Sequence, residues 1–505
     1  MNTNHKKVVL VILDGWGVGA KDGGNPIYTA DLKNIAYIKR NFPTAMLQAS
    51  GLAVGLPWQE EGNSEIGHLT IGAGRTVYQS AARIGMSIDD KSFFKNPVLL
   101  WAMEQAKKNG KSVNFAGLIG TGITHSAFRH LLALIKMAEA VGVPYKLHLM
   151  TDGRDSDPKA CLGLIKELPE EKIGSINGRF FGMDRDNHID RTEKAFGAMT
   201  GRIRAEKSLP SRYVEDSYNQ GTTDEFIKPA CFNPENLAFT SGDSIIFFNF
   251  RSDRMRQISR MFSERIPGSV IAGFTRYDES FPLPYAFSFE EIRNALPSVI
   301  ADNGLSQLHI SESEKQAHVT YFFNGESEKP LPKEFRIILP SKNVSSHDKY
   351  PEMMAEEITT RVITAIQEGL YDFILVNYAN ADIVAHTGNY DATVEAVRFL
   401  DQKIGMLIEA ALRTDTSLVI TADHGNAEEL MDIRTGEKDT RHNPNPVPFY
   451  LVDERFRQER SDTKIEESEY WNAGSLCDIS PTVLDLMGIP KPPEMTGQSI
   501  LPFLQ

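Results

Sequence analysis

Short apolar runs recur along the chain, and each of them stops at polar or charged residues. The run of Val, Ile and Leu at 8–13 ends at Asp14. Similar stretches lie at 111–122, 145–155, 178–186, 244–254, 372–382 and 417–426. Unbroken apolar strands are typical of parallel sheets that are covered on both faces. We therefore expect a buried strand in each stretch, with its polar residues at the strand end.

Helical patterns separate these strands. Apolar residues recur at helical spacing in two clear cases, the first at Met354, Ile358, Val362 and Ile366 and the second at Val394, Val397, Ile404, Leu407 and Ile408. Alternating strands and helices predict an α/β fold. In such sheets ligands bind beyond the carboxyl ends of the strands, which makes the polar residues there the candidates for chemistry.

The length of 505 residues predicts two domains. A proline- and aromatic-rich segment at 279–292 is one candidate linker, and the segment 79–86 is another. The first strand precedes both linkers, whereas the motifs that resemble metal sites follow both. We therefore expect a discontinuous domain of residues 1–78 and 298–505, interrupted by an inserted domain of residues 79–297.

Composition narrows the classes of partner. The net charge of −13 argues against nucleic acid, so an anionic substrate would need a local basic pocket. Three scattered cysteines without a CxxC pair, Cys161, Cys231 and Cys477, favour a reducing cytosol over a disulfide framework or a thiolate zinc site. The first apolar run is too short for a membrane span or a signal peptide. Without heptads or an exposed apolar helix, we expect a cytoplasmic monomer that binds no membrane.

One short segment raises a question that composition does not answer. Residues 60–68 read EEGNSEIGH, with Ser64 following Gly62 and Asn63. Ser and Asn next to Gly are common in turns and at helix N-caps, so an isolated GNS is more often structural than catalytic. Whether Ser64 is a turn residue, a cap or a nucleophile depends on the rest of the chain.

A mixed set of carboxylates and imidazoles suggests a metal centre. Asp382 and His386 are four residues apart and would share one side of a helical turn. The other candidates lie at strand ends or in loops, namely Asp14, Asp423, His424 and His442. Each alone is more often a helix cap or a solvated side chain, but the joint pattern suits Zn²⁺ or Mn²⁺ rather than Ca²⁺. Two metals would activate Ser64 as a nucleophile, with Gly62 giving the backbone room.

Arginines form a second set, also at or just past expected strand ends. Its members are Arg154, Arg185, Arg191, Arg251 and Arg254. Each could be an ordinary surface arginine paired with a neighbouring aspartate, but the repetition favours an anion pocket, because the guanidinium fork matches carboxylate and phosphate oxygens. Asp155, among these cations, would stay ionised and could act as a general base. His125 could orient a substrate or carry a proton, although a lone His is more often structural.

Taken in order, the motifs resemble one family almost from end to end. They include VLVILDGWG, GNSEIGHLTIGAGRTVYQ, DGRDSDP, NFRSDR, KQAHVTYFFNGE, NYANADIVAHTGN and TADHGNAE. On these motifs the chain resembles the cofactor-independent phosphoglycerate mutases of the alkaline phosphatase superfamily. That resemblance implies a three-layer α/β/α phosphatase-like domain with a mostly parallel sheet, interrupted by a second α/β domain.

The resemblance also implies a reaction and a site. The expected enzyme is an isomerase that interconverts 3-phosphoglycerate and 2-phosphoglycerate without 2,3-bisphosphoglycerate, through a phosphoserine at Ser64. One divalent ion would take Asp382, His386 and His442, and the other Asp14, Ser64, Asp423 and His424; Mn²⁺ is the usual metal, and Zn²⁺, Co²⁺ or Mg²⁺ are alternatives. The residues that hold or act on the substrate would be His125, Arg154, Asp155, Arg185, Arg191, Arg251, Arg254 and Lys315. An inserted domain that closes over the site would keep water from the phosphoserine.

The chain departs from the family pattern at a few positions and leaves alternatives open. Thr121 and Ala127 stand where the family commonly has Asp and a second His, Glu61 stands where it has Met, and Asn443 and Pro444 stand where it has small hydroxyl residues. None of them replaces an expected ligand or the nucleophile. The alternatives are a metal-dependent phosphohydrolase of the same superfamily, which would not need the arginine set, and a non-catalytic phosphosugar-binding protein.

Overall fold

The chain forms two compact units. A computed structural model describes residues 5–58, 60–281, 283–288 and 291–504. Unit 1 comprises Met1–Gln79 and Glu291–Gln505, and unit 2 comprises Ser80–Glu290. The sequence placed these boundaries after residue 78 and before residue 298. None of the helices in the described ranges is long and apolar enough to cross a membrane.

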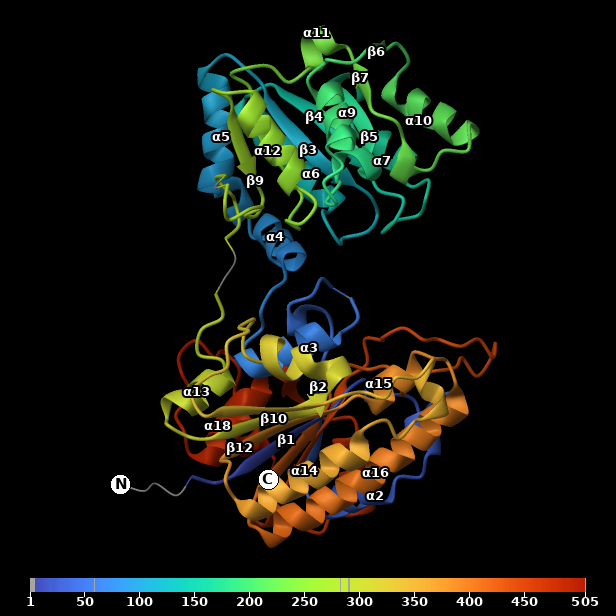
Figure 1. Ribbon diagram of the computed structural model, residues 1–505, viewed down its shortest axis with the longest axis vertical. Coiled ribbons are helices and arrows are strands. Elements are labelled where there is room, and N and C mark those ends of the chain that lie inside the picture. The colour runs from blue at the N-terminus through green and yellow to red at the C-terminus, as the bar shows by residue number, and fades with distance from the viewer. Residues whose placement is uncertain (1–4, 59, 282, 289–290, 505) are drawn as a thin grey trace. The chain divides into compact units, whose positions relative to one another are not determined.

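Unit 1 is built on an eight-stranded sheet in the order β11-β10-β12-β1-β13-β14-β2-β15 (Figure 1). Among these strands only β14 runs against the others, so the sheet is mostly parallel as expected. The bounds are β1 Val8–Leu13, β2 Thr44–Gln48, β10 Gln307–Glu312, β11 Glu334–Leu339, β12 Phe373–Tyr378, β13 Ser417–Thr421, β14 Val447–Val452 and β15 Asn472–Ser475.

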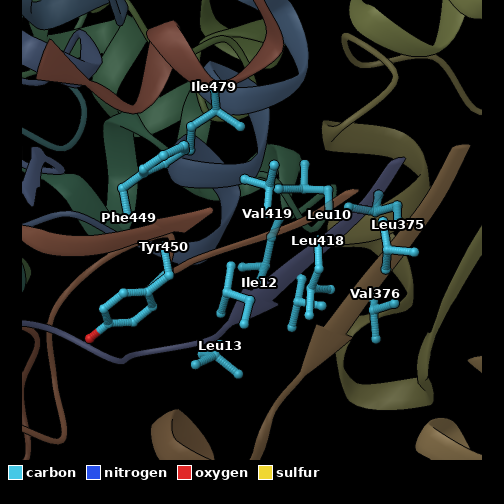
Figure 2. Packing of buried hydrophobic residues seen from close by; sticks show 14 of the residues in the cluster. Leu10, Ile12, Leu13, Leu375, Val376, Leu418, Val419, Phe449, Tyr450 and Ile479 are labelled. Atoms are coloured by element: carbon cyan, nitrogen blue, oxygen red, sulfur yellow. The ribbon is translucent and has the colours of Figure 1, made fainter. Parts of the chain in front are cut away.

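The continuous apolar runs become the centre of this sheet. All six residues of β1 are buried, and β1 pairs in parallel with β12 on one side and with β13 on the other. Figure 2 shows Leu10, Leu375 and Val419 of these three strands in one packed cluster. Burial of both faces is why these strands carry no alternation of polar residues.

Helices cover both faces of the unit 1 sheet and complete three layers (Figure 1). One layer holds α2 Lys33–Asn41, α14 Ala355–Glu368 and α16 Tyr390–Arg413, and the other holds α3 Ser64–Ala73, α13 Leu296–Asp302 and α18 Ile479–Met487. The helical spacing that predicted helices near 354–366 and 394–408 is confirmed by α14 and α16. Shorter helices are α1 Pro26–Thr29, α15 Asn380–Ala385 and α17 Asp462–Ser468.

Unit 2 has its own seven-stranded sheet in the order β6-β7-β5-β4-β3-β8-β9. The bounds are β3 Val113–Ile119, β4 Tyr145–Thr151, β5 Ile173–Gly178, β6 Ala205–Glu206, β7 Ala230–Phe232, β8 Ser244–Phe247 and β9 Val270–Gly273. Strands β3, β4, β5, β8 and β9 are parallel, whereas β7 runs against β5. This second sheet agrees with the expected α/β class.

Two apolar clusters lie on opposite faces of the unit 2 sheet. Phe115 of β3 belongs to the cluster that contains α5 Pro97–Lys108 and α6 Phe128–Val141. Its neighbour Ala116 belongs to the cluster that contains α9 Ile189–Met199 and α12 Arg256–Arg265. Successive strand residues point to opposite faces, so one strand feeds both clusters. The remaining helices of the unit are α4 Ser80–Asp89, α7 Cys161–Ile165, α8 Arg179–Gly182, α10 Pro210–Asn219 and α11 Pro234–Leu237.

One local expectation was wrong. The stretch 178–186 was expected to be a strand, but β5 ends at Gly178 and the apolar residues after it form helix α8. The candidate linker at 79–86 contains the boundary between the two units, which falls between Gln79 and Ser80, and most of it is helical because α4 begins at Ser80. The other candidate linker, 279–292, includes residues 282, 289 and 290, which lie outside the described residues.

Candidate active site

The carboxyl ends of four parallel strands in unit 1 bring the predicted residues together. Asp14 follows β1, Asp423 and His424 follow β13, Asp382 lies in α15 after β12, and Lys315 lies three residues after β10. The backbone joins two of these ends, because Asp14 N–H donates to the carbonyl of Tyr378 and Asp382 N–H donates to the carbonyl of Asp14, both at 3.1 Å. Parallel pairing therefore converts residues far apart in sequence into neighbours.

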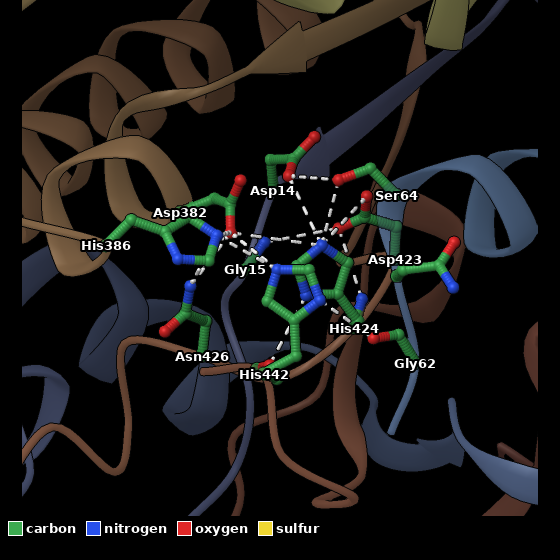
Figure 3. A network of polar contacts seen from close by, with 12 residues as sticks. Asp14, Gly15, Gly62, Ser64, Asp382, His386, Asp423, His424, Asn426 and His442 are labelled. Carbon is green, nitrogen blue, oxygen red and sulfur yellow. Dashed lines mark hydrogen bonds and ion pairs between the residues drawn. The ribbon is translucent and has the colours of Figure 1, made fainter. Parts of the chain in front are cut away.

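Ser64 is neither a turn residue nor the cap of its helix. It is the first residue of α3, and the cap is Asn63, whose side-chain oxygen accepts from Ile66 N–H at 3.0 Å. The Ser64 hydroxyl is thus free to face the strand ends. Its Oγ lies 3.0 Å from Asp14 Oδ1 and 2.9 Å from His424 Nε2 (Figure 3). Lys315 Nζ lies 2.8 Å from the same oxygen.

Gly62 allows this approach, as the sequence predicted. A Cβ at residue 62 would lie 2.2 Å from the carbonyl oxygen of Ala49 and 2.9 Å from Cβ of His424. Neither position is tolerable for a carbon atom, so a larger residue would push the 62–64 segment away from the strand ends.

Three imidazoles turn their Nε2 atoms toward this cluster. Nδ1 of each ring faces a backbone carbonyl oxygen, at 2.7 Å for His386, 2.9 Å for His442 and 3.3 Å for His424. A proton on Nδ1 then leaves a lone pair on Nε2, which is the arrangement of metal-bound histidines. The Nε2 atoms of His386 and His442 are 3.0 Å apart, and Asp382 Oδ1 lies 3.2 Å and 3.4 Å from them (Figure 3). Lone pairs that face one another so closely suit a shared cation.

Buried opposite charges dominate the electrostatics. Burial works against the charge of Lys315, but the carboxylates of Asp14, Asp382 and Asp423 outweigh it and raise the pKa of Lys315. Burial likewise opposes the charge of His424, yet Asp423 and its neighbours raise the pKa of His424 to about 9. The protein thus accumulates negative charge here, and a divalent ion would displace the proton of His424 on binding.

The donor set fits divalent metal. Two groups of residues each bring three candidate ligand atoms within 4.8 Å of one another, Asp382 with His424 and His442, and Asp14 with His68 and Asp423. Buried carboxylate and imidazole ligands of this kind suit transition ions. These groups overlap the two expected ligand sets but divide them differently, with His424 grouped beside Asp382 and with His386 in neither group.

Sequence reasoning missed several polar side chains that line the cluster. His68 is buried in α3, where its Nδ1 lies 2.8 Å from the carbonyl of Ser64 and 3.2 Å from Asp423 Oδ2. The Asn377 amide donates to Asp14 at 2.8 Å and lies 3.0 Å from His68 Nε2, and the Asn426 amide donates to Asp382 at 2.9 Å. His68 appeared in the segment around Ser64, but its helical position among apolar residues gave no sign of a role. Asn377 lies inside a strand, where a lone polar residue is the only signal.

The arginine set lies in unit 2, in the segments that follow the parallel strands β4, β5 and β8. Arg185 Nη1 lies 3.0 Å from Asp253 and Arg191 Nη1 lies 3.1 Å from Asp184, while Arg254 donates to the carbonyl of Met183 at 3.2 Å. Arg251 also faces Asp253, at 3.3 Å, and the largely exposed Arg154 lies 3.7 Å from Glu225. The pKa of Arg254 is lowered, mainly by burial and to a smaller extent by the guanidinium groups of Arg179 and Arg185. The arginines are therefore close enough to repel one another, although each has a local partner.

His125 and Asp155 share the same region of unit 2. His125 is buried, and its Nε2 lies 3.5 Å from Asp155 Oδ2. Both of them contact Arg179, a buried residue that the sequence did not single out. Arg179 was overlooked because the stretch that contains it was expected to be a strand.

Comparison with known proteins places this geometry in a family. The model of the Metalloenzyme superfamily matches residues 6–491. The 2,3-bisphosphoglycerate-independent phosphoglycerate mutase 1 of Methanosarcina acetivorans is 42% identical over 98% of both chains. The enzyme with the same name from Pseudomonas fluorescens is 40% identical over 99% of this chain and 100% of its own. A crystal structure of Leishmania mexicana phosphoglycerate mutase at low cobalt concentration, 25% identical, covers 98% of both chains with a TM-score of 0.61.

Proposed function

We propose that this chain, which belongs to the Metalloenzyme superfamily and, within it, to the 2,3-bisphosphoglycerate-independent phosphoglycerate mutases, works through a phosphoserine at Ser64. The enzyme is an isomerase that interconverts 3-phosphoglycerate and 2-phosphoglycerate. The observation that carries the proposal is the placement of the Ser64 hydroxyl, which lies within 3.0 Å of Asp14, His424 and Lys315. A serine in an ordinary environment is a poor nucleophile, and such neighbours are what activate it.

Two divalent ions, most often Mn²⁺, complete the site in this proposal. One would be held by Asp382, His386 and His442, and the other by Asp14, Ser64, Asp423 and His424. The inward lone pairs of the three imidazoles and the buried carboxylates support this assignment. When bound, such ions lower the pKa of the serine hydroxyl and neutralise the charge of the phosphoryl group. His424 lies close to ligands of both ions, because its ring is grouped with Asp382 and His442 rather than with Asp14 and Asp423.

The transfer itself has two balanced halves. In the first half Ser64 gives up its hydroxyl proton as Oγ bonds to phosphorus, the bond from phosphorus to O3 of the substrate breaks, and O3 takes a proton. In the second half O2 of the glycerate loses its proton as it bonds to the same phosphorus, the bond from phosphorus to Ser64 Oγ breaks, and Ser64 Oγ takes a proton again. Lys315 Nζ, 2.8 Å from Ser64 Oγ, would stabilise the charge on the transferring group in both halves.

The glycerate is bound by unit 2 in this scheme. The guanidinium groups of Arg154, Arg185, Arg191, Arg251 and Arg254 would hold its anionic groups, and His125 would orient it. Asp155, as a carboxylate, would take the proton from O2 as that oxygen attacks. Because the glycerate stays bound from the first phosphoryl transfer to the second, its acceptor hydroxyl keeps a high effective concentration near the phosphoserine.

Trapping the phosphoserine tests this function. The enzyme with Mn²⁺ is mixed with 3-phosphoglycerate, quenched in acid and digested, and the peptide that contains Ser64 is measured by mass spectrometry. We expect phosphate on Ser64. Ser499→Ala is the matched control, because the Ser499 hydroxyl bonds to Asp485, which belongs to neither expected ligand set, and its loss should not change the yield. Turnover without phosphate on Ser64 would rule out the proposed route.

A further inference from the structure

Arg179 is a buried cation in unit 2 that the proposed reaction does not use. It begins helix α8 directly after β5, and 3% of its surface is exposed. Its guanidinium makes three contacts. Nη1 donates to Asp152 Oδ1 at 2.5 Å and to Asp155 Oδ2 at 2.6 Å, and Nη2 lies 3.0 Å from His125 Nε2. One side chain thus holds both the expected base and the expected orienting histidine.

The contact with His125 decides where that imidazole carries its proton. A guanidinium only donates hydrogen bonds, so His125 Nε2 has to accept with its lone pair. An imidazole that accepts at Nε2 carries its single proton at Nδ1 and is neutral. His125 Nδ1 is buried, and among the described residues it has no hydrogen-bond partner. A proton on Nε2 would instead meet the N–H of Arg179 at 3.0 Å, while the other neighbour of Nε2, Asp155 Oδ2, lies at 3.5 Å, beyond the usual length of an N–H···O bond.

The charges around His125 agree with a neutral ring. Burial, and then the positive charge of Arg179, lower the pKa of His125 to about 4. Asp155 and Asp253 act in the opposite direction, and Arg251 adds to the lowering. The sum keeps the imidazole uncharged across the range in which a free histidine titrates.

We propose that Arg179 is a positioning residue, which holds His125 neutral in a single tautomer and fixes the carboxylate of Asp155 at the same time. The roles of His125 and Asp155 toward substrate rest on the proposed function, whereas the state of the ring does not. A neutral His125 contributes no charge that could be lost between pH 6 and 8. The arginines, which do not titrate there, then carry the charge recognition of an anionic substrate.

A purely structural role for Arg179 would look different. Its bond to Asp152 alone could hold the 152–156 turn, where Asp152 also accepts from Ser156 Oγ at 2.7 Å. In that case loss of Arg179 would lower stability but leave the ionisation of His125 unchanged. The protonation state of His125 therefore separates the two roles.

The first test reads the histidine directly. The unliganded full-length chain is labelled with ¹⁵N-histidine, and the His125 signals are assigned by their loss in His125→Asn. We expect a protonated Nδ1 and an unprotonated Nε2, with no change from pH 8 to pH 5.5. A ring that is protonated at Nε2, or that titrates between pH 6 and 7, would overturn the proposal.

The second test asks whether Arg179 is the cause. Arg179→Met removes the charge and the donors, and Arg179→Lys keeps the charge but lacks the fork that reaches three partners. In Arg179→Met we expect the His125 signals to titrate at a higher pH than in the wild type, and in Arg179→Lys, which keeps the charge, we expect His125 to lose its single tautomer. In both variants we expect kcat to fall about 100-fold, as a misplaced catalytic group implies. If Arg179→Met does not fold, Arg179→Lys carries the test. Unchanged His125 signals together with unchanged kcat would overturn the assignment.

A matched control tests whether the effect is specific to Arg179. Arg212→Lys makes the same change at an exposed arginine of unit 2, which pairs with Glu215 at 2.8 Å and with Asp216 at 2.9 Å. It should alter neither the His125 signals nor kcat. Because the spectra need no turnover, an enzyme that makes no 2-phosphoglycerate but shows the expected ring would contradict the proposed function and leave the role of Arg179 standing.

Discussion

Ser64 gains its chemistry from its neighbours. Its hydroxyl meets a carboxylate, an imidazole and an ammonium within 3.0 Å, and Asn63 takes over the capping that a serine at this point of a helix often performs. In the proposed reaction the GNS segment therefore divides two tasks, with Asn63 as the helix cap and Ser64 as the nucleophile.

Removal of this hydroxyl should stop the reaction without unfolding the chain. Ser64→Ala deletes one oxygen and leaves the cap at Asn63 in place. We expect turnover to disappear and the circular dichroism spectrum and the melting temperature in the absence of metal to stay close to those of the wild type. Retained turnover in a folded Ser64→Ala enzyme would refute the nucleophile.

Lys315 is expected to matter nearly as much. Its ammonium donates to Asp14 at 2.5 Å, to Asp382 at 2.8 Å and to Ser64 at 2.8 Å. Lys315→Met keeps a similar length but removes the charge, and should lower kcat by about 10²- to 10³-fold, as the loss of one transition-state donor does. Lys329→Met, at an exposed position, is the control. Equal rates for the two variants would show that Lys315 has no part in the transfer.

At the scale of single residues, sequence patterns identified the charged side chains that follow apolar strands. They did not identify side chains within helices or strands, or a residue in a segment whose structure was wrongly predicted. Asp14, Asp423 and His424 stand out because each follows an apolar strand. His68 and Asn377 carry no such signal, since they sit inside a helix and a strand and reach the cluster only through tertiary packing. Arg179 was hidden by a wrong strand assignment.

At the scale of elements, apolar runs identify strands well when both faces are buried. Strands β1, β12 and β13 are such runs, and they form the centre of the unit 1 sheet. Strand β5, with the sequence IGSING, is polar and glycine-rich for a buried strand, and the more apolar residues after it misled the prediction. Of its two polar side chains, Ser175 has a partner in the sheet, since its hydroxyl bonds to His148 at 2.9 Å, whereas the buried amide of Asn177 has no hydrogen-bond partner among the described residues.

That partner, His148, gives unit 2 a pH-dependent stability. It is buried in β4, lies 3.0 Å from Asn114 Oδ1 through its Nε2, and its pKa falls to about 3, mainly through burial. The folded pKa lies below the unfolded value of about 6.5. The stabilisation by the neutral His148 is therefore complete above pH 6.5 and is lost as the pH falls toward 3. At pH 5 the free energy of unfolding is lower by about 2 kcal/mol than at high pH.

Chemical denaturation at pH 7 and pH 5 measures this effect. We expect His148→Gln to be less stable than the wild type at pH 7 but to lose less stability between the two pH values. An identical loss in both proteins would mean that His148 does not titrate as its burial implies.

At the scale of the whole molecule, the order of motifs along the chain carried most of the prediction. Two mostly parallel sheets and a first strand separated from its neighbours in unit 1 by more than two hundred residues follow from that order. The contacts that define each unit are spread over many residues, so the sequence located the boundaries only approximately.

Metal should couple the site to the stability of unit 1. The cluster gathers three buried carboxylates around Lys315, and a divalent ion adds charge of the sign that they require. An ion present at 100 times its dissociation constant stabilises a folded protein by about 2.7 kcal/mol. We expect chelation to abolish activity and lower the melting temperature, and Mn²⁺ to restore both. Full activity in excess chelator would contradict the metal site.

The most direct test of the account follows both products of one reaction. Chelator-stripped enzyme receives Mn²⁺ and 3-phosphoglycerate, with no 2,3-bisphosphoglycerate, and phosphorus NMR records 2-phosphoglycerate and inorganic phosphate together. We expect 2-phosphoglycerate without release of phosphate. Phosphate alone would contradict it and favour a phosphohydrolase, and neither product, with Mn²⁺ bound, would favour a binding protein.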